Sequence, residues 1–255
     1  MYEVGKVKVM KTLKTIIVIG ASSEIGQEIS LKLASQGYNL LLTYNSSHDE
    51  INSLKEEINN NYKIQLSIVK LNLLSDIDHQ FKKALEKISL ESLIGMVFCA
   101  GYTPERKFFS RLSLDEVKKT FLINVISAYE LASIVSTKMK SNLALEEGSI
   151  VFISSQVAKF GSNGISAYVA SKGGLNSLGI SLAKELGPSK IRVNIISPGA
   201  VKKNNNDNKV LSDIEKSIPL GRCCHSEDIA NVVAFLFSKE SRFLNGVDIP
   251  LNGGR

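Results

Sequence analysis

The chain has 255 residues, of which 44% are hydrophobic and 22% charged, and its formal net charge is +6. This composition is ordinary for a globular protein, and no linker rich in proline, serine or like charges divides the chain, so we expect one domain with a sizeable core. The lysines and arginines are spread along amphipathic segments without interleaved aromatic residues, which disfavours a nucleic-acid partner.

Cysteine usage and hydropathy bear on the cellular setting. Cys99, Cys223 and Cys224 have neither the spacing of a zinc site nor that of a disulfide framework, so we expect no metal and a reducing, cytoplasmic environment. The sequence contains no apolar run of about eighteen residues and its start lacks the apolar core of a signal peptide, so we expect no membrane association. Residues 1–14 are predicted to form an N-terminal extension, in which Met10 could equally be the true start.

Six short apolar runs follow one another along the chain and alternate with longer stretches of helical periodicity. The runs cover residues 15–20, 39–44, 64–71, 93–100, 149–154 and 191–197. Their nearly continuous apolar character is typical of strands in a parallel sheet that is covered on both faces. The alternation predicts an α/β fold over residues 15–255, a single-domain Rossmann fold with a doubly wound parallel sheet of about seven strands and helices on both faces. The polar, asparagine-rich stretch 199–222 after the sixth run predicts a lid or substrate loop.

The sequence GASSEIG directly follows the first predicted strand. Gly20 permits a tight turn there, and the small side chains of Ser22 and Ser23 let a ligand approach the backbone. Gly26 allows close packing of the next helix, whose free N–H groups favour a pyrophosphate. The turn therefore predicts a dinucleotide site, although Glu24 stands where a third glycine is usual and such a turn alone is a weak signal.

The end of the second predicted strand bears on the choice of cofactor. An NAD site usually places an acid there to bond the adenosine ribose. Tyr44, Asn45 and Ser46 instead offer hydroxyl and amide groups, and the first acid is Asp49. This arrangement tolerates a 2′-phosphate and favours NADP(H), while NAD(H) stays the alternative because no arginine or lysine stands at this point.

A tyrosine and a lysine lie one helical turn apart in the sequence SAYVASKGG. Tyr168 and Lys172 are therefore predicted to rise from the same helix face. An adjacent ammonium stabilises phenolate and lowers the tyrosine pKa from about 10, so the pair can donate or accept a proton. A bare YxxxK is far more often an ordinary surface pair. Ser155 at the end of the fifth strand and Asn124 inside an apolar helix favour the catalytic interpretation.

In this order and spacing, the motifs resemble the short-chain dehydrogenase/reductase family from about residue 15 to the C-terminus. The resemblance rests on GASSEIG, CAG at 99–101, Asn124, Ser155, Tyr168 with Lys172, RVNIISPG at 192–199 and NGVDIPLNGG near the end. It implies an NADP-dependent oxidoreductase in which Tyr168 protonates the carbonyl oxygen of a ketone and Ser155 hydrogen-bonds that oxygen. It also implies that Lys172 lowers the tyrosine pKa and holds the nicotinamide ribose, while Asn124 positions a proton-relaying water.

The resemblance also implies where the cofactor lies. It places the cofactor along Gly20, Ser22, Ser23, Glu24, Ile25, Gly26, Tyr44, Asn45, Ser46, Asn72, Leu73, Ala100, Gly101, Tyr168, Lys172, Pro198, Gly199 and Val201. Three departures from the family pattern affect this set. The sequence FCAG at 98–101 lacks two amides of the usual NNAG, Asn72 replaces an aspartate that usually reaches the adenine, and Lys203 replaces a cofactor-bonding threonine.

Within the family the chain looks most similar to 3-oxoacyl-[acyl-carrier-protein] reductases, on RVNIISPG, IPLGR, SEDIANVVAFL and the closing glycines. The similarity implies reduction of a carrier-bound ketone in fatty-acid-type biosynthesis. Such proteins usually offer basic residues to the acidic carrier, whereas this chain has Glu146 and Glu147 in one such region and only Lys190 near the other. A reductase of a small-molecule ketone, such as a sugar or polyketide intermediate, therefore stays open. A non-catalytic dinucleotide sensor is a further alternative, disfavoured because the Asn–Ser–Tyr–Lys set is complete.

The predicted helices around 113–142 and 166–186 carry more apolar positions than one sheet face should cover. Family members commonly pair these helices between subunits, and the C-terminal strand would lie at a second contact. We therefore expect a homotetramer, or at least a dimer.

Overall fold

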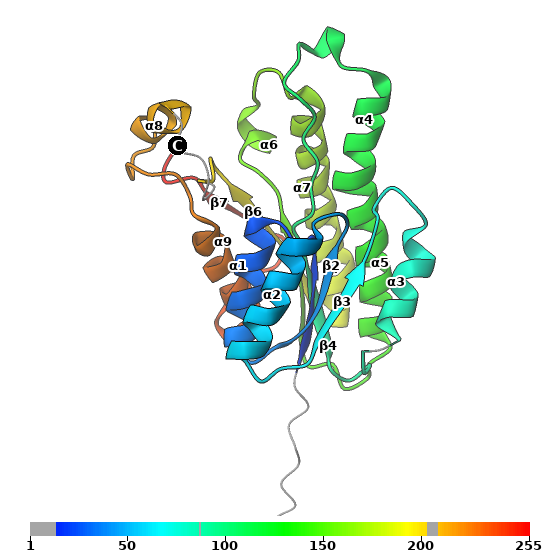
Figure 1. The fold of residues 1–255 in the computed structure, drawn as a ribbon. Coiled ribbons are helices and arrows are strands. Elements are labelled where there is room, and N and C mark those ends of the chain that lie inside the picture. Colours follow the sequence, from blue (N-terminus) through cyan, green and yellow to red (C-terminus); the bar gives the residue numbers. More distant parts are fainter. Residues whose placement is uncertain (1–13, 87, 203–208) are drawn as a thin grey trace, which may run out of the picture.

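The computed structural model describes residues 14–86, 88–202 and 209–255. They form one seven-stranded, all-parallel sheet in the order β3-β2-β1-β4-β5-β6-β7 (Figure 1). The strands are β1 (Thr15–Ile19), β2 (Asn39–Tyr44), β3 (Leu66–Lys70), β4 (Leu93–Phe98), β5 (Gly148–Ile153), β6 (Ile191–Pro198) and β7 (Asp248–Leu251). The predicted doubly wound sheet is confirmed, and its order reverses between β1 and β4.

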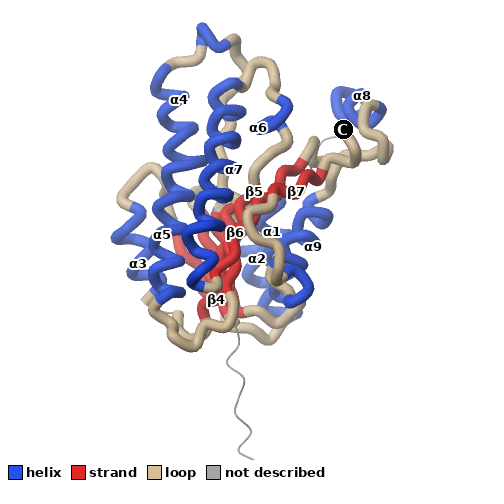
Figure 2. Tube along the Cα trace, turned by 180° about the vertical axis from the view of Figure 1, so that it is seen from behind, coloured by secondary structure: helices blue, strands red, loops and turns tan. Residues whose placement is uncertain are grey.

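Helices cover both faces of the sheet (Figures 1 and 2). One face carries α1 (Glu24–Ser35), α2 (His48–Asn61) and α9 (Ser226–Leu236), and the other carries α3 (Ile77–Leu85), α5 (Ser127–Lys140) and α7 (Ser166–Leu186). The helix α4 (Leu114–Phe121) continues through a π-helical turn, η2 (Leu122–Ile126), into α5. Shorter elements are η1 (Phe109–Arg111), α6 (Val157–Phe160), η3 (Gly187–Ser189), α8 (Lys209–Lys216) and η4 (Lys239–Ser241).

The central strands are buried along their whole length, which explains their continuous apolar sequences. Successive side chains of a strand point to opposite faces, so each strand supplies both cores. In β1, for example, Ile16 and Val18 pack with α1 and α9, whereas Ile17 and Ile19 pack with α3 and α5. The edge strands β3 and β7 are only partly buried.

The helix α7 lies close to the sheet because of a glycine. A Cβ atom at Gly179 would stand 2.7 Å from Ile195 and 3.2 Å from Phe152. Any larger residue would push α7 away from β5 and β6. This close packing fixes the distance between α7 and the sheet. The first turns of α7 carry Tyr168 and Lys172, so their position relative to the strand ends is fixed as well.

The predicted lid over 199–222 is partly described. It contains the helix α8, and Val201 forms a parallel bridge with Cys224 where the stretch leaves and returns to the sheet. Residues 203–208, including Lys203, and residues 1–13 of the expected N-terminal extension lie outside the described residues.

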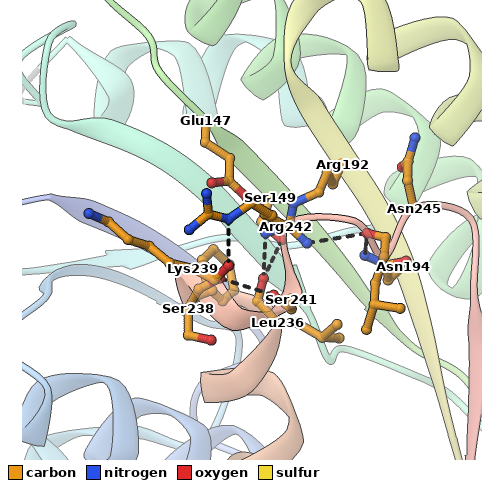
Figure 3. A network of polar contacts seen from close by, with 12 residues as sticks. Glu147, Ser149, Arg192, Asn194, Leu236, Ser238, Lys239, Ser241, Arg242 and Asn245 are labelled. Atoms are coloured by element: carbon orange, nitrogen blue, oxygen red, sulfur yellow. Dashed lines mark hydrogen bonds and ion pairs between the residues drawn. The ribbon is translucent and has the colours of Figure 1, made fainter.

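A buried arginine ties the amino edge of the sheet together (Figure 3). Arg192 of β6 donates from Nε to Glu147 Oε1 at 2.7 Å, from Nη2 to the Leu236 carbonyl at 2.9 Å and from Nη1 to the Leu244 carbonyl at 3.3 Å. Its side chain is only 9% exposed. Arg192 therefore links the start of β5, the end of α9 and the segment before β7. These three segments meet at the edge of the sheet opposite the carboxyl ends of its strands.

We expect Arg192→Met to lower the free energy of unfolding by about 3 kcal/mol, because it leaves Glu147 without its ion-pair partner and removes one of the two donors that each of the Leu236 and Leu244 carbonyls has. Urea unfolding at one fixed protein concentration measures the loss. Arg242→Met is the matched control, since Arg242 is exposed and, within the described residues, its side chain bonds the Lys239 carbonyl through Nε. Equal stability of the two variants would contradict a structural role for Arg192.

Candidate active site

A cleft of about 770 Å³ opens at the carboxyl ends of the strands, where the strand order reverses. Ligands of open α/β sheets bind at such a point, and the volume suits a ligand of dinucleotide or smaller size. The lining comes from segments that follow six strands, together with α4, η2, α7 and α9. It consists of Gly20, Ser22, Ser23, Glu24, Ile25, Asn45, Ser46, Asn72, Leu73, Leu74, Cys99, Ala100, Gly101, Tyr102, Thr103, Lys119, Ile123, Ile153, Ser154, Tyr168, Lys172, Val201 and Ser226.

The turn between β1 and α1 is built as a phosphate-binding turn requires. Gly20 has a φ of +84°, and a Cβ atom on it would stand 2.8 Å from the Ala100 backbone. Ser23 caps α1: its hydroxyl accepts from the Gly26 N–H at 3.1 Å and donates to the Gly20 carbonyl at 2.9 Å. The Ser23 hydroxyl is therefore occupied within the turn, and a phosphate would be held by backbone N–H groups.

Glu24 is the departure in this turn. It lies in the first turn of α1 and lines the cleft. Its carboxylate interacts favourably with the helix dipole but repels a phosphate at the same place. A glycine, which is usual here, would leave the positive end of the helix to the ligand alone.

The end of β2 supports the turn and lines the cleft beside it. Thr43 accepts a hydrogen bond from the Gly20 N–H at 3.2 Å, while Asn45 and Ser46 line the cleft. The Tyr44 hydroxyl instead lies 3.3 Å from Nδ1 of His48. Within the described lining, Glu24 is the sole carboxylate, and the end of β2 contributes hydroxyl and amide groups.

Tyr168 and Lys172 rise together into the cleft from α7, as their spacing predicted. The hydroxyls of Ser155 and Thr103 lie near the Tyr168 phenol and favour its ionised form. Burial raises the pKa of Tyr168 above its usual value, and the two hydroxyls partly oppose this. In the chain alone, burial is therefore the main cause of the shift in the Tyr168 pKa, whereas the resemblance implies a lowering of this pKa by the neighbouring lysine.

Lys172 is 3% exposed, and its ammonium donates to the Ile153 carbonyl at the end of β5 at 2.8 Å. The ammonium nitrogen lies 5.7 Å from the centre of the Tyr168 ring. Burial lowers the pKa of Lys172 to about 8. At neutral pH the lysine is still mostly protonated, so a positive charge stands beside the phenol.

Asn124 lies at the centre of the π-helical turn η2 and is fully buried. Its Oδ1 accepts from the Tyr102 N–H at 2.7 Å, and its Nδ2 donates to the Tyr102 carbonyl at 2.9 Å and to Ser171 Oγ at 2.9 Å. These contacts explain why an amide occupies an apolar helix. Single π-turns often mark functional positions, and this one turns the amide toward the segment that follows β4.

The structure brings together most of the residues that the sequence singled out. Six of them are not part of the cleft lining: Gly26, Tyr44, Asn124, Ser155, Pro198 and Gly199. Asn124 nevertheless contacts the lining through Tyr102, and the Ser155 hydroxyl lies near Tyr168. A Cβ atom at Gly199 would stand 3.1 Å from Asn252, so this glycine serves the packing of β6 against the C-terminal segment.

Several lining residues were missed by the sequence analysis. The most informative are Tyr102, Thr103, Lys119, Ser154 and Ser226. Tyr102 and Thr103 directly follow the CAG motif, which was a local signal for them. Lys119 reaches the cleft from α4 and lies 4.4 Å over the Tyr102 ring, a contact that no sequence pattern reveals.

Cys99 replaces one of the usual amides at the end of β4. Its Sγ lies 3.0 Å from the Ile19 carbonyl and 3.4 Å from the Gly20 carbonyl, as a weak hydrogen-bond donor. Burial raises its pKa to about 12. The thiol therefore stays protonated and props the turn after β1, and it is a poor nucleophile.

Known proteins are similar to this chain in sequence. The family model described as enoyl-(acyl carrier protein) reductase matches residues 20–255. The 3-oxoacyl-[acyl-carrier-protein] reductase FabG of Aquifex aeolicus is 32% identical over 246 residues, covering 94% of this chain and 96% of that protein. FabG of Staphylococcus aureus is 33% identical over 257 residues, covering 96% and 99%. An uncharacterized oxidoreductase of Bacillus subtilis, YmfI, is 31% identical over 247 residues, covering 94% and 98%.

Solved structures have a similar fold. A putative short-chain dehydrogenase/reductase from Burkholderia xenovorans superimposes with a TM-score of 0.85 at 26% identity, covering 95% of this chain and 98% of that one. NAD⁺-bound xylitol dehydrogenase shares the fold, with a TM-score of 0.85 at 24% identity over 96% of this chain and all of that one. The parallel sheet, the cleft at its reversal point and these matches over nearly the whole length lead to one conclusion: the chain belongs to the short-chain dehydrogenase/reductase family of oxidoreductases.

Proposed function

We propose that this chain is an NADP(H)-dependent reductase that converts a 3-oxoacyl group, carried by an acyl carrier protein, to the secondary alcohol. The observation that carries the proposal is the meeting of Tyr168, Lys172 and the Ser155 hydroxyl at one end of the dinucleotide-sized cleft. Relatives named as 3-oxoacyl-[acyl-carrier-protein] reductases, 32% and 33% identical, support the substrate class.

The arrangement suits proton transfer to a ketone oxygen. When bound, the dinucleotide supplies a hydride to the carbonyl carbon. Tyr168 donates its phenol proton to the carbonyl oxygen, and the Ser155 hydroxyl hydrogen-bonds the same oxygen as its negative charge develops. The raised pKa of Tyr168 keeps the phenol protonated at neutral pH until the ketone arrives. The nearby Lys172 ammonium then stabilises the phenolate that remains.

The residues of the cleft fit a dinucleotide. The positive φ of Gly20 and its close approach to Ala100 leave the backbone N–H groups at the start of α1 accessible to a pyrophosphate. Asn45 and Ser46 would face the adenosine ribose without a carboxylate from the end of β2. These features support NADP(H), although Glu24 adds a negative charge near the phosphates.

We expect NADPH to bind at least about tenfold more tightly than NADH, a difference of roughly 1.4 kcal/mol. The physical reason is the absence of an acid at the end of β2, where a 2′-phosphate would lie. Titration followed by cofactor fluorescence measures both affinities. Equal affinities, or tighter binding of NADH, would contradict the assignment.

A reductase of a ketone that is not carried by a protein is the second candidate. Glu146 and Glu147 border the start of β5, in a region where carrier-dependent relatives usually offer basic residues, and Glu147 is fixed by Arg192. Arg192 compensates the charge of Glu147, and the exposed Glu146 offers an acidic carrier no attraction in this region.

One substrate panel separates the two candidates and tests the role of Tyr168. With NADPH we expect the turnover of 3-oxoacyl thioesters to exceed that of keto-sugars.

Tyr168→Phe should lower the turnover of the preferred substrate by about 10²–10⁴-fold, the usual contribution of general acid catalysis. The phenylalanine keeps the ring, so NADPH affinity should be retained. Preferred reduction of keto-sugars would favour the second candidate, and near-normal turnover by Tyr168→Phe would leave a dinucleotide-binding protein without this catalytic pair.

We also propose a cytoplasmic homotetramer or dimer. Leu114, Ile126 and Tyr129 are 67%, 51% and 60% exposed along α4, η2 and α5. The helical run Leu114–Lys140 is long and apolar enough to cross a membrane by length and composition, but 44% of its apolar window is buried against the rest of the fold. A partner subunit on its outer face accounts for the remaining apolar surface.

Sedimentation at micromolar concentration should therefore give at least twice the chain mass of 27.9 kDa. We expect Tyr129→Glu to shift the population toward monomer, because it places a charge within the proposed contact. Leu143→Glu is the control: Leu143 is 99% exposed but lies beyond the end of α5, and the variant should keep the parent mass. A monomeric parent protein would rule out both proposed subunit contacts, the one through the outer face of α4, η2 and α5 and the one through the C-terminal strand.

A further inference from the structure

We propose that the Ser226 hydroxyl is a further contact for the diphosphate of the dinucleotide, so that the N-terminus of α9 binds this group together with that of α1. The inference rests on the proposed reductase function, which requires a dinucleotide in the cleft. It assigns a ligand to a side chain that the sequence analysis did not single out and that the proposed proton transfer does not use.

The Ser226 hydroxyl is a buried polar group that the folded chain leaves unsatisfied. Ser226 is the first residue of α9, is only 5% exposed and lines the cleft. Its Oγ has no hydrogen-bond partner among the described residues. Buried hydroxyls normally have a partner, because an unsatisfied one costs free energy. Gln156 and Asn176 also carry an unpartnered side-chain oxygen, but neither residue lines the cleft. A ligand in the cleft can therefore supply the missing partner at Ser226.

The backbone just before Ser226 is tied to the segment that follows β6. Val201, which also lines the cleft, forms a parallel bridge with Cys224. The Cys224 N–H donates to the Ala200 carbonyl, and the Lys202 N–H donates to the Cys224 carbonyl, both at 2.9 Å. Ser226 follows Cys224 by two residues, so its side chain meets the cleft from a fixed backbone.

The helices α1 and α9 pack side by side on one face of the sheet, and Ile29 and Ile229 belong to the same core (Figure 1). The beginnings of both helices reach the cleft, through Ser23 at the N-cap of α1 and Ser226 in the first turn of α9. The first N–H groups of a helix have no acceptor within it, and together with the helix dipole they favour an anion. A diphosphate at the turn between β1 and α1 would therefore lie beside a second helix N-terminus.

The acidic side chains at this end of α9 are compatible with a diphosphate. Asp228 accepts two hydrogen bonds from Arg222, at 2.6 and 3.0 Å, so its charge is compensated. Glu227 is exposed and is not part of the cleft lining. Glu24 is the sole carboxylate of the described lining, and a further donor from Ser226 would offset part of its repulsion of the phosphates.

The test measures the affinities of Ser226→Ala and of the parent protein for NADPH and NADH by cofactor fluorescence. We expect the variant to bind both about tenfold more weakly, because it loses a hydrogen bond to a charged group and the two cofactors share the diphosphate. The preference for NADPH over NADH should stay unchanged. Ser136→Ala is the matched control: Ser136 is also buried in a helix, but its Oγ donates to the Ser133 carbonyl at 3.2 Å and it lies outside the cleft lining. This variant should keep the parent affinities.

Stability without cofactor gives a second readout of opposite sign. Ser226→Ala removes an oxygen that has no partner, so its midpoint of urea unfolding should be no lower than that of the parent at the same protein concentration.

Unchanged affinity for both cofactors would overturn the inference and leave bound water as the partner of the hydroxyl. Weaker binding of NADPH alone would also overturn it, because the contact would then be to the 2′-phosphate. A lower midpoint without cofactor would show that the hydroxyl is satisfied within the protein, which equally contradicts the inference. A parent protein that shows the expected loss for both cofactors but reduces no ketone would contradict the proposed function, while the role of Ser226 would stand.

Discussion

The hydrogen bond from the Lys172 ammonium to the Ile153 carbonyl is the interaction on which the site depends. A buried ammonium without an acceptor would lose its proton or force water into the core, so this bond fixes where α7 meets the end of β5. Tyr168 lies one turn earlier on the same helix, and Ser155 lies two residues after Ile153 on the same strand end. Anchoring one side chain therefore sets the relative positions of the proton donor and the hydroxyl beside it. The close packing of Gly179 on Ile195 keeps the rest of α7 at the same depth.

Much of the fold could be predicted from the sequence, because a parallel sheet covered on both faces leaves continuous apolar runs. The run 149–154 corresponds to β5 within one residue, and 39–44 corresponds to β2. The π-helical turn could not be foreseen, since an apolar helical pattern does not distinguish it from a regular α-helix and the contact of Asn124 with Tyr102 joins distant segments. The helix α8 was expected only as part of a polar loop, because the surrounding asparagines hid its short amphipathic pattern.

The site was predictable where function needs residues close in sequence. Tyr168 and Lys172 are one turn apart, and that spacing alone places them on one face. Thr103 is different: it lines the same cleft as Tyr168 from a segment more than sixty residues away, and the neighbouring order of β4 and β5 in the sheet brings the two segments together. The direction of the Tyr168 pKa shift also escaped the sequence, because it depends on how deeply the folded chain buries the phenol.

The π-helical turn η2 also constrains how the gene for this chain can change. A π-turn holds one residue more than an α-helical turn, so it takes up that residue locally and leaves the helix beyond it in phase. A single-residue deletion within η2 would therefore restore a regular helix and leave α5 packed on β4. The same deletion would remove the bulge that turns the Asn124 amide toward the Tyr102 backbone. The length of this turn therefore matters to the active site more than to the core.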